Sequence, residues 1–302
     1  MFRIKESNKQ LGNSINAFLK RRDKLTRIEW EKFLRPLMRN AENEIITKIK
    51  SNTLSSWQLS NLKRIQANIN ETIIGFNNQF QAALANGQDK LAEFSANEAD
   101  FRLKFAKLNI PSKVFISKDV LATIQPLTQN FVNFFSQEMA RIVGSEIATG
   151  LSTNQSINQV SLAIKKRFKS SQMSFARAHR IASTEMLTAS SAADISRGLE
   201  IAEENPEARK VWIDQHKPNA RTSHIATENR SKRKPLTMKA LFRVGGERAL
   251  FPRDLRLSAK NRVNCGCNLV YVNKNDREGL QEISDSVIDQ KDKDKVFATK
   301  RK

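Results

Sequence analysis

Two cysteines have the clearest capacity for chemistry in this sequence of 302 residues. Cys265 and Cys267 are the only cysteines in the chain, and a single residue separates them in the stretch RVNCGCNLVYV. A disulfide between them would close a very small, strained ring and is therefore disfavoured. The other interpretations are a metal site, a reactive thiol and a buried structural corner. Because two cysteines cannot form a disulfide framework, the count favours a reducing compartment or a particle assembled in one.

A metal site would need about two more ligands, and the segment before the cysteines supplies two histidines. His216 and His224, with Cys265 and Cys267, make a Cys2His2 set whose ligand types suit zinc. The spacing is not that of a zinc finger, because Cys-x-Cys is shorter than the usual Cys-x2–4-Cys. A nucleophilic cysteine helped by His224 lacks an evident third group to orient the histidine. We favour a structural role, in which small residues hold the last strand against the loop of His224.

The stretch IDQHKPNARTSHIATEN raises a second catalytic hypothesis. Asp214, His216, Asn219 and His224 are residue types found in nucleases that use one metal ion. Such motifs are arranged around a strand followed by a helix, and no helix is evident after His224. A metal-dependent nuclease is therefore the alternative function, and a non-enzyme is the first expectation.

The charge of the chain indicates its class of partner. There are 52 Lys and Arg against 31 Asp and Glu, which gives a net charge of +21 and a pI near 10.2. Such an excess attracts polyanions, of which nucleic acid is the usual one, and makes binding steeply dependent on salt. The alternative is a solvated basic surface with no particular partner.

The positive charge is densest between residues 217 and 262, where 13 basic residues face 3 acidic ones. No module that reads base sequence is recognisable there, and phosphate contacts position a protein without specifying sequence. We therefore expect contact with double-stranded DNA that is independent of sequence, with the RSKRK run (230–234) in an exposed loop. The candidate residues are Lys217, Arg221, Arg230, Lys232, Arg233, Lys234, Arg243, Arg248, Arg253, Arg256, Lys260 and Arg262.

The elements that position these residues fall into a helical part and a short β-containing part. Gly (10) and Pro (7) are scarce, which favours long helices. Residues 1–110 predict helices, with a kink at Pro36, an apolar stripe over Leu59–Phe80 and a helix stop at Ala85–Gly87. A stripe of this kind is typical of core or of a surface for a partner helix. Further helices are expected over 119–203.

After residue 207 the pattern changes to short runs rich in branched and aromatic residues. KVWI (210–213) and NLVYV (268–272) predict strands. Between them, Gly245-Gly246 predicts the turn of a hairpin, because glycine accepts the positive φ angles that a tight turn requires. The β-containing unit is thus expected over 207–273, and the charged tail 274–302 is expected to be partly mobile.

No segment approaches the ~20 apolar residues of a membrane-spanning helix. The first residues lack the apolar region of a signal peptide. We therefore expect no membrane partner.

Five segments together resemble one known family. AHRIASTEMLTASSAA, KVWIDQ, ARTSHIATEN, LFRVGGERALFPRD and LSAKNRVNCGCNLVYV resemble, in this order, the phage Mu F-like minor head protein family. It is also called the head morphogenesis family of tailed phages. The resemblance covers about residues 140 to 273. The matching positions are Thr184, Glu185, Trp212, Arg221, His224, Gly245, Gly246, Glu247, Asn264, Cys265 and Cys267.

The chain departs from the family pattern around the cysteines. Many relatives have Arg between them, where this chain has Gly266. Some relatives have an additional Cys-x-x-Cys in the first loop that would complete a metal site with four ligands, and here that loop has no cysteine. The resemblance thus implies a structural role for this motif in the present chain.

The helical periodicity and the resemblance together predict a mainly α protein. Elongated N-terminal helices (1–110), in which no family motif is identifiable, precede a head-morphogenesis domain (111–273) with a small α+β part. The expected function is that of a minor head protein inside the capsid of a virion, bound near the portal. It would meet the portal protein and the scaffold or major capsid protein, in part through the Leu59–Phe80 stripe. It would assist head assembly and the packaging or delivery of DNA.

Overall fold

The computed structural model describes residues 2–105, 118–169, 174–215 and 220–274. The chain divides into two compact units. We call residues 27–87 and 123–185 the helical unit, and residues 1–26, 88–122 and 186–302 the sheet-bearing unit. This division differs from the expected sequential one at residue 110, because the helices α1, α3, α4 and α6 each contribute residues to both units.

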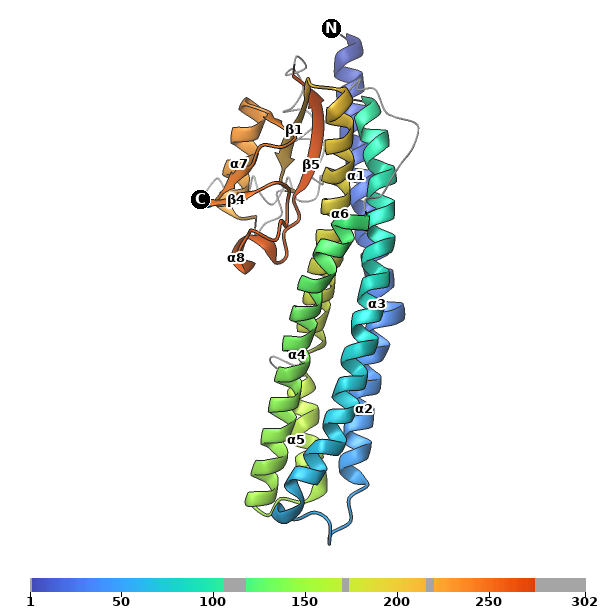
Figure 1. The fold of residues 1–302 in the computed structure, drawn as a ribbon, viewed down its shortest axis with the longest axis vertical. Coiled ribbons are helices and arrows are strands. Elements are labelled where there is room, and N and C mark those ends of the chain that lie inside the picture. The colour runs from blue at the N-terminus through green and yellow to red at the C-terminus, as the bar shows by residue number, and fades with distance from the viewer. Residues whose placement is uncertain (1, 106–117, 170–173, 216–219, 275–302) are drawn as a thin grey trace. The chain divides into compact units, whose positions relative to one another are not determined.

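The element order confirms a mainly α fold with a small sheet region toward the C-terminal end of the described chain (Figure 1). None of the described helices combines the length and the apolar character needed to cross a membrane. The elements are α1 (Phe2–Glu29), the π-helical turn η1 (Trp30–Leu34), α2 (Arg35–Lys50), the 3-10 turn η2 (Leu59–Asn61), α3 (Leu62–Phe105), α4 (Lys118–Ser152), α5 (Ile157–Lys169), α6 (Phe175–Glu204), β1 (Ala208–Ile213), α7 (Thr222–Arg233), β2 (Leu236–Thr237), β3 (Phe242–Val244), β4 (Glu247–Ala249), α8 (Ala259–Arg262) and β5 (Asn268–Asn273).

The helical unit uses the Leu59–Phe80 stripe as core. Ile65, Ile69, Ile73, Phe76 and Phe80 are all buried, and the ring of Phe76 lies 6.4 Å from that of Phe135 on α4. An amphipathic helix in a bundle buries its apolar face against its neighbours. The prediction that this stripe contacts a partner is therefore wrong for these residues, which are already covered.

Two predictions about helix interruptions have different outcomes. Near Pro36 the helix is irregular: the π turn η1 lies directly before it, with Arg35 N–H donating to Trp30 O. Proline has no N–H to bond the preceding turn, so a local change of hydrogen bonding suits this position. The predicted stop at Ala85–Gly87 is wrong, because α3 continues to Phe105. Leu84 and Leu91 are buried on either side, and their burial outweighs the roughly 1 kcal/mol that a helical glycine costs.

The sheet-bearing unit contains an antiparallel sheet of order β2-β1-β5. Trp212 of β1 is opposite Leu269 of β5, and Val211 is opposite Val270. The strands predicted over 210–213 and 268–272 are thus confirmed, and they pair with each other. Because side chains alternate along a strand, these pairs lie on opposite faces of the sheet.

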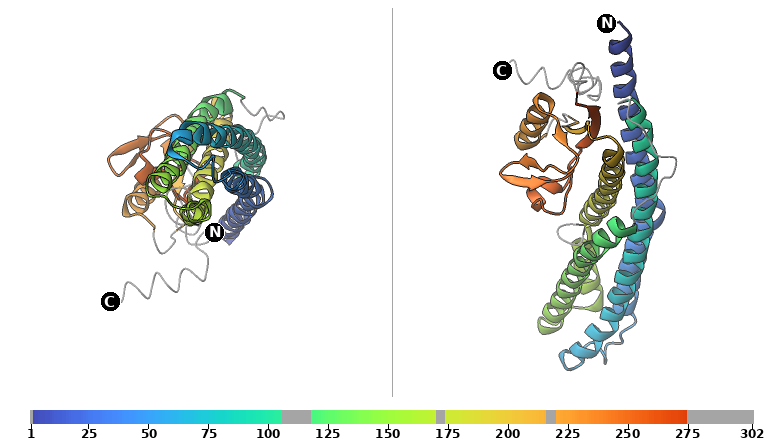
Figure 2. Two further views of the ribbon diagram at one scale, coloured as in Figure 1. Left: turned by 90° about the horizontal axis from the view of Figure 1, so that it is seen from below. Right: turned by 45° about the horizontal axis from the view of Figure 1, so that its top comes forward.

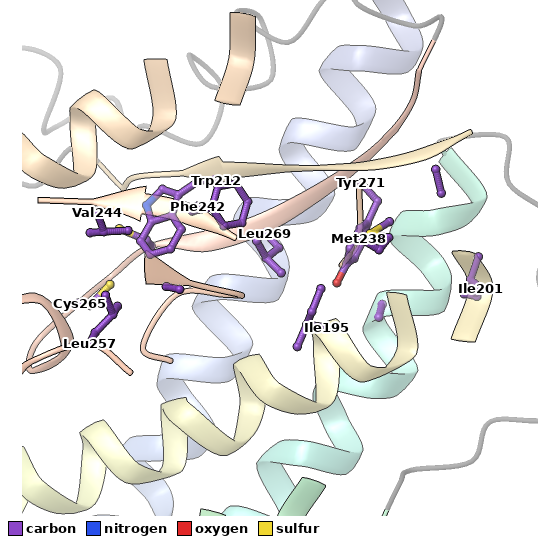
Figure 3. Close-up of a cluster of buried hydrophobic side chains, with 14 residues drawn as sticks. Ile195, Ile201, Trp212, Met238, Phe242, Val244, Leu257, Cys265, Leu269 and Tyr271 are labelled. Atoms are coloured by element: carbon purple, nitrogen blue, oxygen red, sulfur yellow. The ribbon is translucent and has the colours of Figure 1, made fainter. Parts of the chain in front are cut away.

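Both faces of this sheet are covered, as Figures 1 and 2 show. On one face, Val211, Ile213, Val270 and Val272 pack with residues of α1 and with Phe94 of α3. On the other face, α6, the β3–β4 hairpin and residues 250–267 between β4 and β5, which we call the closing segment, surround the aromatic side chains of the strands (Figure 3). That core includes Ile195, Ile201, Trp212, Phe242, Val244, Leu257, Leu269 and Tyr271.

The hairpin and the helix before it differ in how well sequence predicted them. The hairpin is confirmed, with φ of +58° at Gly245 and +94° at Gly246. The loops expected at His224 and over Arg230–Lys234 are wrong, because residues 222–233 form α7. The side chains that α7 buries recur at helical spacing but are polar, so an apolar periodicity could not reveal them. They are His224, Thr227, Glu228 and Ser231.

Candidate metal centre and basic surface

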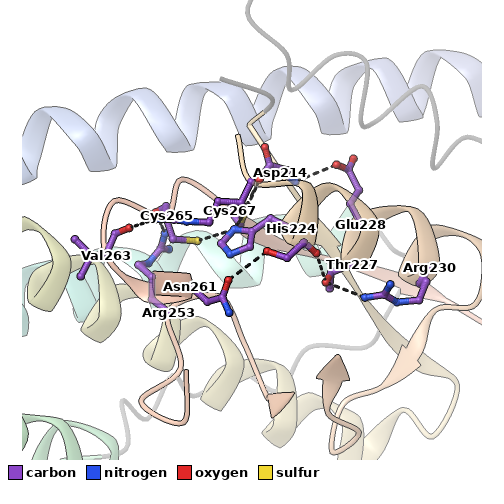
Figure 4. A network of polar contacts seen from close by, with 12 residues as sticks. Asp214, His224, Thr227, Glu228, Arg230, Arg253, Asn261, Val263, Cys265 and Cys267 are labelled. Carbon is purple, nitrogen blue, oxygen red and sulfur yellow. Dashed lines mark hydrogen bonds and ion pairs between the residues drawn. The ribbon is translucent and has the colours of Figure 1, made fainter. Parts of the chain in front are cut away.

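Three donor side chains of the sheet-bearing unit converge in its interior (Figure 4). His224, Cys265 and Cys267 place one ligand atom each within 4.8 Å of one another. The Nδ1 atom of His224 lies 3.2 Å from Sγ of Cys267 and 3.7 Å from Sγ of Cys265. All three side chains are buried, and neither cysteine forms a disulfide. The predicted meeting of the cysteines with His224 is confirmed, and the group could hold a metal ion.

A fourth polar side chain touches this group. Asp214, which directly follows β1, accepts a hydrogen bond from Sγ of Cys267 at 3.0 Å. Its Oδ2 atom lies 4.0 Å from Nδ1 of His224. The backbone N–H of Asp214 in turn donates to Glu228 of α7. The sequence had offered His216 as the fourth ligand, and this residue lies outside the described part of the chain.

Backbone contacts hold the two cysteines in place. Arg253 donates to the carbonyl oxygens of Leu187 and Cys265 and to Oγ of Ser191. Arg221 donates to the carbonyl oxygen of Val263, two residues before Cys265. The main-chain oxygens of Val263 and Cys265 thus accept hydrogen bonds from arginine side chains. These bonds hold the backbone of this segment without the help of the sulfur atoms.

Asn264 has an unusual conformation beside this segment. Its φ is +57°, in the left-handed region that Asn tolerates better than most residues. The asparagine of the Asn-Cys-x-Cys stretch thus has a physical reason, because it tolerates the left-handed backbone directly before Cys265. At Gly266 an added Cβ would lie 2.5 Å from the side-chain oxygen of Gln215, so a larger residue there would require the Gln215 side chain to move.

The two thiols differ in their acidity. The hydrogen bond from Cys267 lowers the pKa of the Cys265 thiol, and His224 and Arg253 act in the same direction. Burial raises the pKa of the Cys267 thiol, and the negative charges of Cys265 and Asp214 add to this. A single shared proton between neighbouring sulfur atoms explains the opposite directions.

The histidine of this cluster cannot reach a substrate in the described structure. His224 is 1% exposed, and its ring packs edge-to-face against Trp212 at 5.7 Å. The nuclease hypothesis and the nucleophilic cysteine both require contact with a substrate. The geometry therefore fits a structural centre better than a catalytic one.

Other motif residues support the turns around the cluster. Glu247 accepts hydrogen bonds from the N–H and the hydroxyl of Ser258, which lowers the pKa of its carboxyl group. An added Cβ at Gly245 would lie 3.2 Å from Cβ of Ser223 on α7, so the hairpin turn needs its glycine for space as well as for φ. These residues fix the hairpin and the loop that leads to α8.

Thr184 and Glu185 lie on α6 within the helical unit. Both are buried, and Glu185 accepts a hydrogen bond from Thr128 of α4 at 3.2 Å. This agrees with a pairing role inside a helical bundle.

Comparison with known proteins gives one weak similarity. The chain is 28% identical over 167 residues to "Uncharacterized protein YqbB" of Bacillus subtilis (strain 168). That stretch is 54% of this chain and 51% of the other protein, so the chain spans about half the length of the curated relative it matches. No family model matches the chain. No solved structure matches it either.

Some of the basic residues predicted to contact DNA are exposed in the structure, and others are buried. The exposed candidates lie on the second half of α7 or directly after it, on the β3–β4 hairpin and in the closing segment. They are Arg230, Arg233, Lys234, Arg243, Arg248, Arg256 and Lys260. Lys217 lies outside the described residues.

Two predicted DNA contacts are wrong. Arg253 is 1% exposed and Arg262 is 5% exposed, so neither can meet a phosphate. Both have partners inside the protein: Arg253 holds the Cys265 segment, and Arg262 donates to Thr188 of α6. Charge density along the sequence counts buried and exposed arginines alike, which is why it could not separate them.

Two further candidates are half-buried and engaged. Arg221 donates to Val263 O, and Lys232 forms an ion pair with the fully buried Glu228 at 3.2 Å. Their replacement would disturb the fold, so they are poor probes of DNA binding.

Arg243 and Arg248 form the core of the remaining surface. They are directly opposite each other on the hairpin, and both are exposed. Arg230 of α7 donates to the carbonyl oxygen of Arg243, which brings a third guanidinium to the same place. Like charges directly opposite in a sheet are destabilising. This surface therefore has the properties of a site that an anion would neutralise.

Sequence reasoning missed one buried amine. Lys210 of β1 is 0% exposed, donates to Leu250 O at 2.7 Å and lies 5.0 Å from the centre of the Phe242 ring. Burial lowers its pKa to about 7. The only signal in the sequence was the position of this lysine, which begins the apolar run KVWI and alternates with Trp212 on the same face of the strand.

Proposed function

We propose that this chain is a minor head protein of a tailed phage. It acts inside the procapsid near the portal and assists head assembly and the packaging or delivery of DNA. Its partners are the portal protein and the scaffold or major capsid protein, and it meets them in the host cytoplasm before it becomes part of the virion. This role is supported by the resemblance in five ordered segments. Several residues of these segments form or support the cysteine–histidine cluster.

The DNA part of the proposal rests on the Arg243–Arg248 pair. Two exposed guanidinium groups opposite each other, with Arg230 beside them, can each neutralise a phosphate. The contacts would be to the DNA backbone and so independent of base sequence.

The cysteine–histidine cluster belongs to the same proposal as a zinc site. Two thiolates and an imidazole are ligands that zinc prefers, and a buried site without access to substrate is typical of structural zinc. The zinc would stabilise the sheet-bearing unit and take no part in a reaction.

Quantitative mass spectrometry of procapsids and mature particles tests the role in the head. We expect a few copies per particle, in constant ratio to the portal protein. Absence from both kinds of particle would overturn the assignment. Incubation of DNA with the protein and a divalent cation tests the nuclease alternative. We expect no cleavage of the DNA. Cleavage that is lost in His224→Ala would support the nuclease instead.

A salt titration tests the DNA surface. Affinity for unrelated duplexes should fall steeply between about 50 and 200 mM salt, with little difference between sequences. The variant Arg230→Ala/Arg243→Ala/Arg248→Ala should lower the slope of log affinity against log salt by about 3, one for each phosphate contact. The control Arg39→Ala/Lys63→Ala/Arg64→Ala removes the same charge from exposed positions of the helical unit and should lower the slope by less than about 1.

Two results would contradict the DNA proposal. Equal slopes for the two triple variants would mean that net charge binds DNA, without a defined surface. Discrimination between sequences of about a hundredfold or more would mean that bases are read.

A further inference from the structure

We propose that Asp214 is the fourth ligand of the zinc site, in the position that the sequence had assigned to His216. The inference rests on the zinc part of the proposed function. Asp214 directly follows β1, His224 lies in the first turn of α7, and Cys265 and Cys267 precede β5. One ion at this point would join the end of β1, the start of α7 and the distant segment before β5 (Figure 4).

Four of the six distances between the donor atoms are close to those of a tetrahedral zinc site. With ordinary zinc bond lengths, the edges of such a tetrahedron measure roughly 3.3 to 3.8 Å. Cys267 lies 3.2 Å from His224 and 3.0 Å from Asp214, Cys265 lies 3.7 Å from His224, and Asp214 lies 4.0 Å from His224. Each of these four distances is within about 0.3 Å of that range. The donor atoms that all lie within 4.8 Å of one another are those of His224, Cys265 and Cys267, so the Asp214 carboxylate would have to move toward Cys265 when the ion binds.

Asp214 is well placed for this role for a second reason. It is 5% exposed, and its backbone N–H is bonded to Glu228. The main chain that carries the carboxylate is thereby fixed between β1 and α7. A ligand on rigid elements loses little conformational freedom when the metal binds.

Charge supports a carboxylate as fourth ligand. A zinc ion with two thiolates, one imidazole and one carboxylate has one negative charge in excess. Arg253, whose hydrogen bonds go to neutral acceptors, places a buried positive charge at the carbonyl of Cys265. The carboxylate, the ion, the thiolates and Arg253 together are neutral, which a buried site requires.

The competing arrangement is a hydrogen-bonded group without a metal. In that case the Cys267 thiol donates to Asp214, and His224 accepts from a thiol or donates to a thiolate. This arrangement needs no zinc, and it predicts that the thiols react with reagents only when the unit opens.

X-ray absorption at the zinc edge of the purified full-length chain distinguishes these arrangements. We expect one zinc per chain, bound by two sulfur atoms and two nitrogen or oxygen atoms. Imidazole rings give a recognisable outer-shell signal, and we expect the signal of one ring. Two rings would mean that His216 is the fourth ligand, and a chain without zinc after expression in zinc-supplied cells would overturn the site altogether.

Two matched variants sharpen the result. In chelator competition, Asp214→Asn should lower zinc affinity by more than about 100-fold, beyond the roughly 10–100-fold loss expected for an outer-shell partner. His216→Ala should change it by less than about 3-fold, well below that same outer-shell loss. The reverse order would overturn the inference. If Asp214→Asn does not fold, the imidazole count of the unaltered chain still decides.

Failure of this inference leaves the rest of the proposed function measurable. A chain with two zinc-bound imidazoles, or with no zinc, can still be found in particles and can still show the salt slope of the Arg243–Arg248 surface. Absence from particles would instead remove the head role and leave the zinc count unchanged.

Discussion

The helical unit and the sheet-bearing unit bury different kinds of polar group. In the helical unit, amides and hydroxyls of facing helices bond one another, as Asn77 and Gln81 do with Asn133. Its buried charged side chains are few among the described residues, with Glu29 and Glu185 as examples. The sheet-bearing unit buries a larger set: Arg22, Asp194, Arg197, Lys210, Asp214, His224, Glu228, Arg253, Asp254 and Arg262.

This difference indicates what each unit responds to. A buried charge is tolerated only with a partner or a change of protonation, so the sheet-bearing unit should respond to pH and to chelators. The helical unit, which buries few charged side chains among its described residues, should respond to pH less. The two units therefore call for different perturbations.

The largest effect is expected from a cavity in the sheet-bearing unit. Trp212→Ala removes a side chain that is 0% exposed and should destabilise this unit by about 3–5 kcal/mol. Hydrogen exchange of peptides from β1 and β5 measures the loss. Trp57→Ala is the control in the helical unit. Trp57 is half-buried with one hydrogen bond, to Gln155 O, and we expect a loss of about 1 kcal/mol. Equal losses would mean that the complete burial of Trp212 does not set the size of its loss.

The next effect is a dependence of stability on pH. Burial lowers the pKa of Lys210 to about 7 from its usual 10.5, against the opposing effect of Asp254. Between these values the unfolded chain binds more protons, so stability should rise with pH from about 7 to about 10.5. The full change is on the order of a few kcal/mol.

The variant Lys210→Met isolates that contribution. Its unfolding free energy should lack the rise that the unaltered chain shows over this pH range, whatever constant offset comes from the lost bond to Leu250. Lys63→Met, at an exposed position of the helical unit, should leave the rise in place. A parallel pH profile for Lys210→Met and the unaltered chain would show that the amine stays charged when buried.

The smallest effects are expected from two glycines of the helical unit. An added Cβ at Gly150 would lie 2.1 Å from a methyl carbon of Val160 on α5, so Gly150→Ala should destabilise by about 1–3 kcal/mol. At Gly75 nothing lies within 4 Å, and Gly75→Ala should stabilise α3 by about 0.5–1 kcal/mol. Denaturant unfolding followed by circular dichroism measures the change in unfolding free energy of each variant, and therefore its sign. Neither variant should alter zinc content, and a change in zinc content would contradict the separation of the two units' responses.

Local patterns were sufficient for several elements. The hairpin was predictable because Gly245-Gly246 is a local signal, and β1 and β5 were predictable because their apolar runs are short and bounded. The α7 helix was not, because the residues it buries are polar and its interior contacts are made with other segments.

The amino-acid sequence by itself determined the residue types of the candidate centre and the excess of positive charge. Only the tertiary structure decided that Asp214 reaches Cys267, that Arg253 and Arg262 are interior, and that Arg243 opposes Arg248. The physical reason is that burial and pairing depend on contacts between segments distant in the chain. Composition and spacing describe each segment alone.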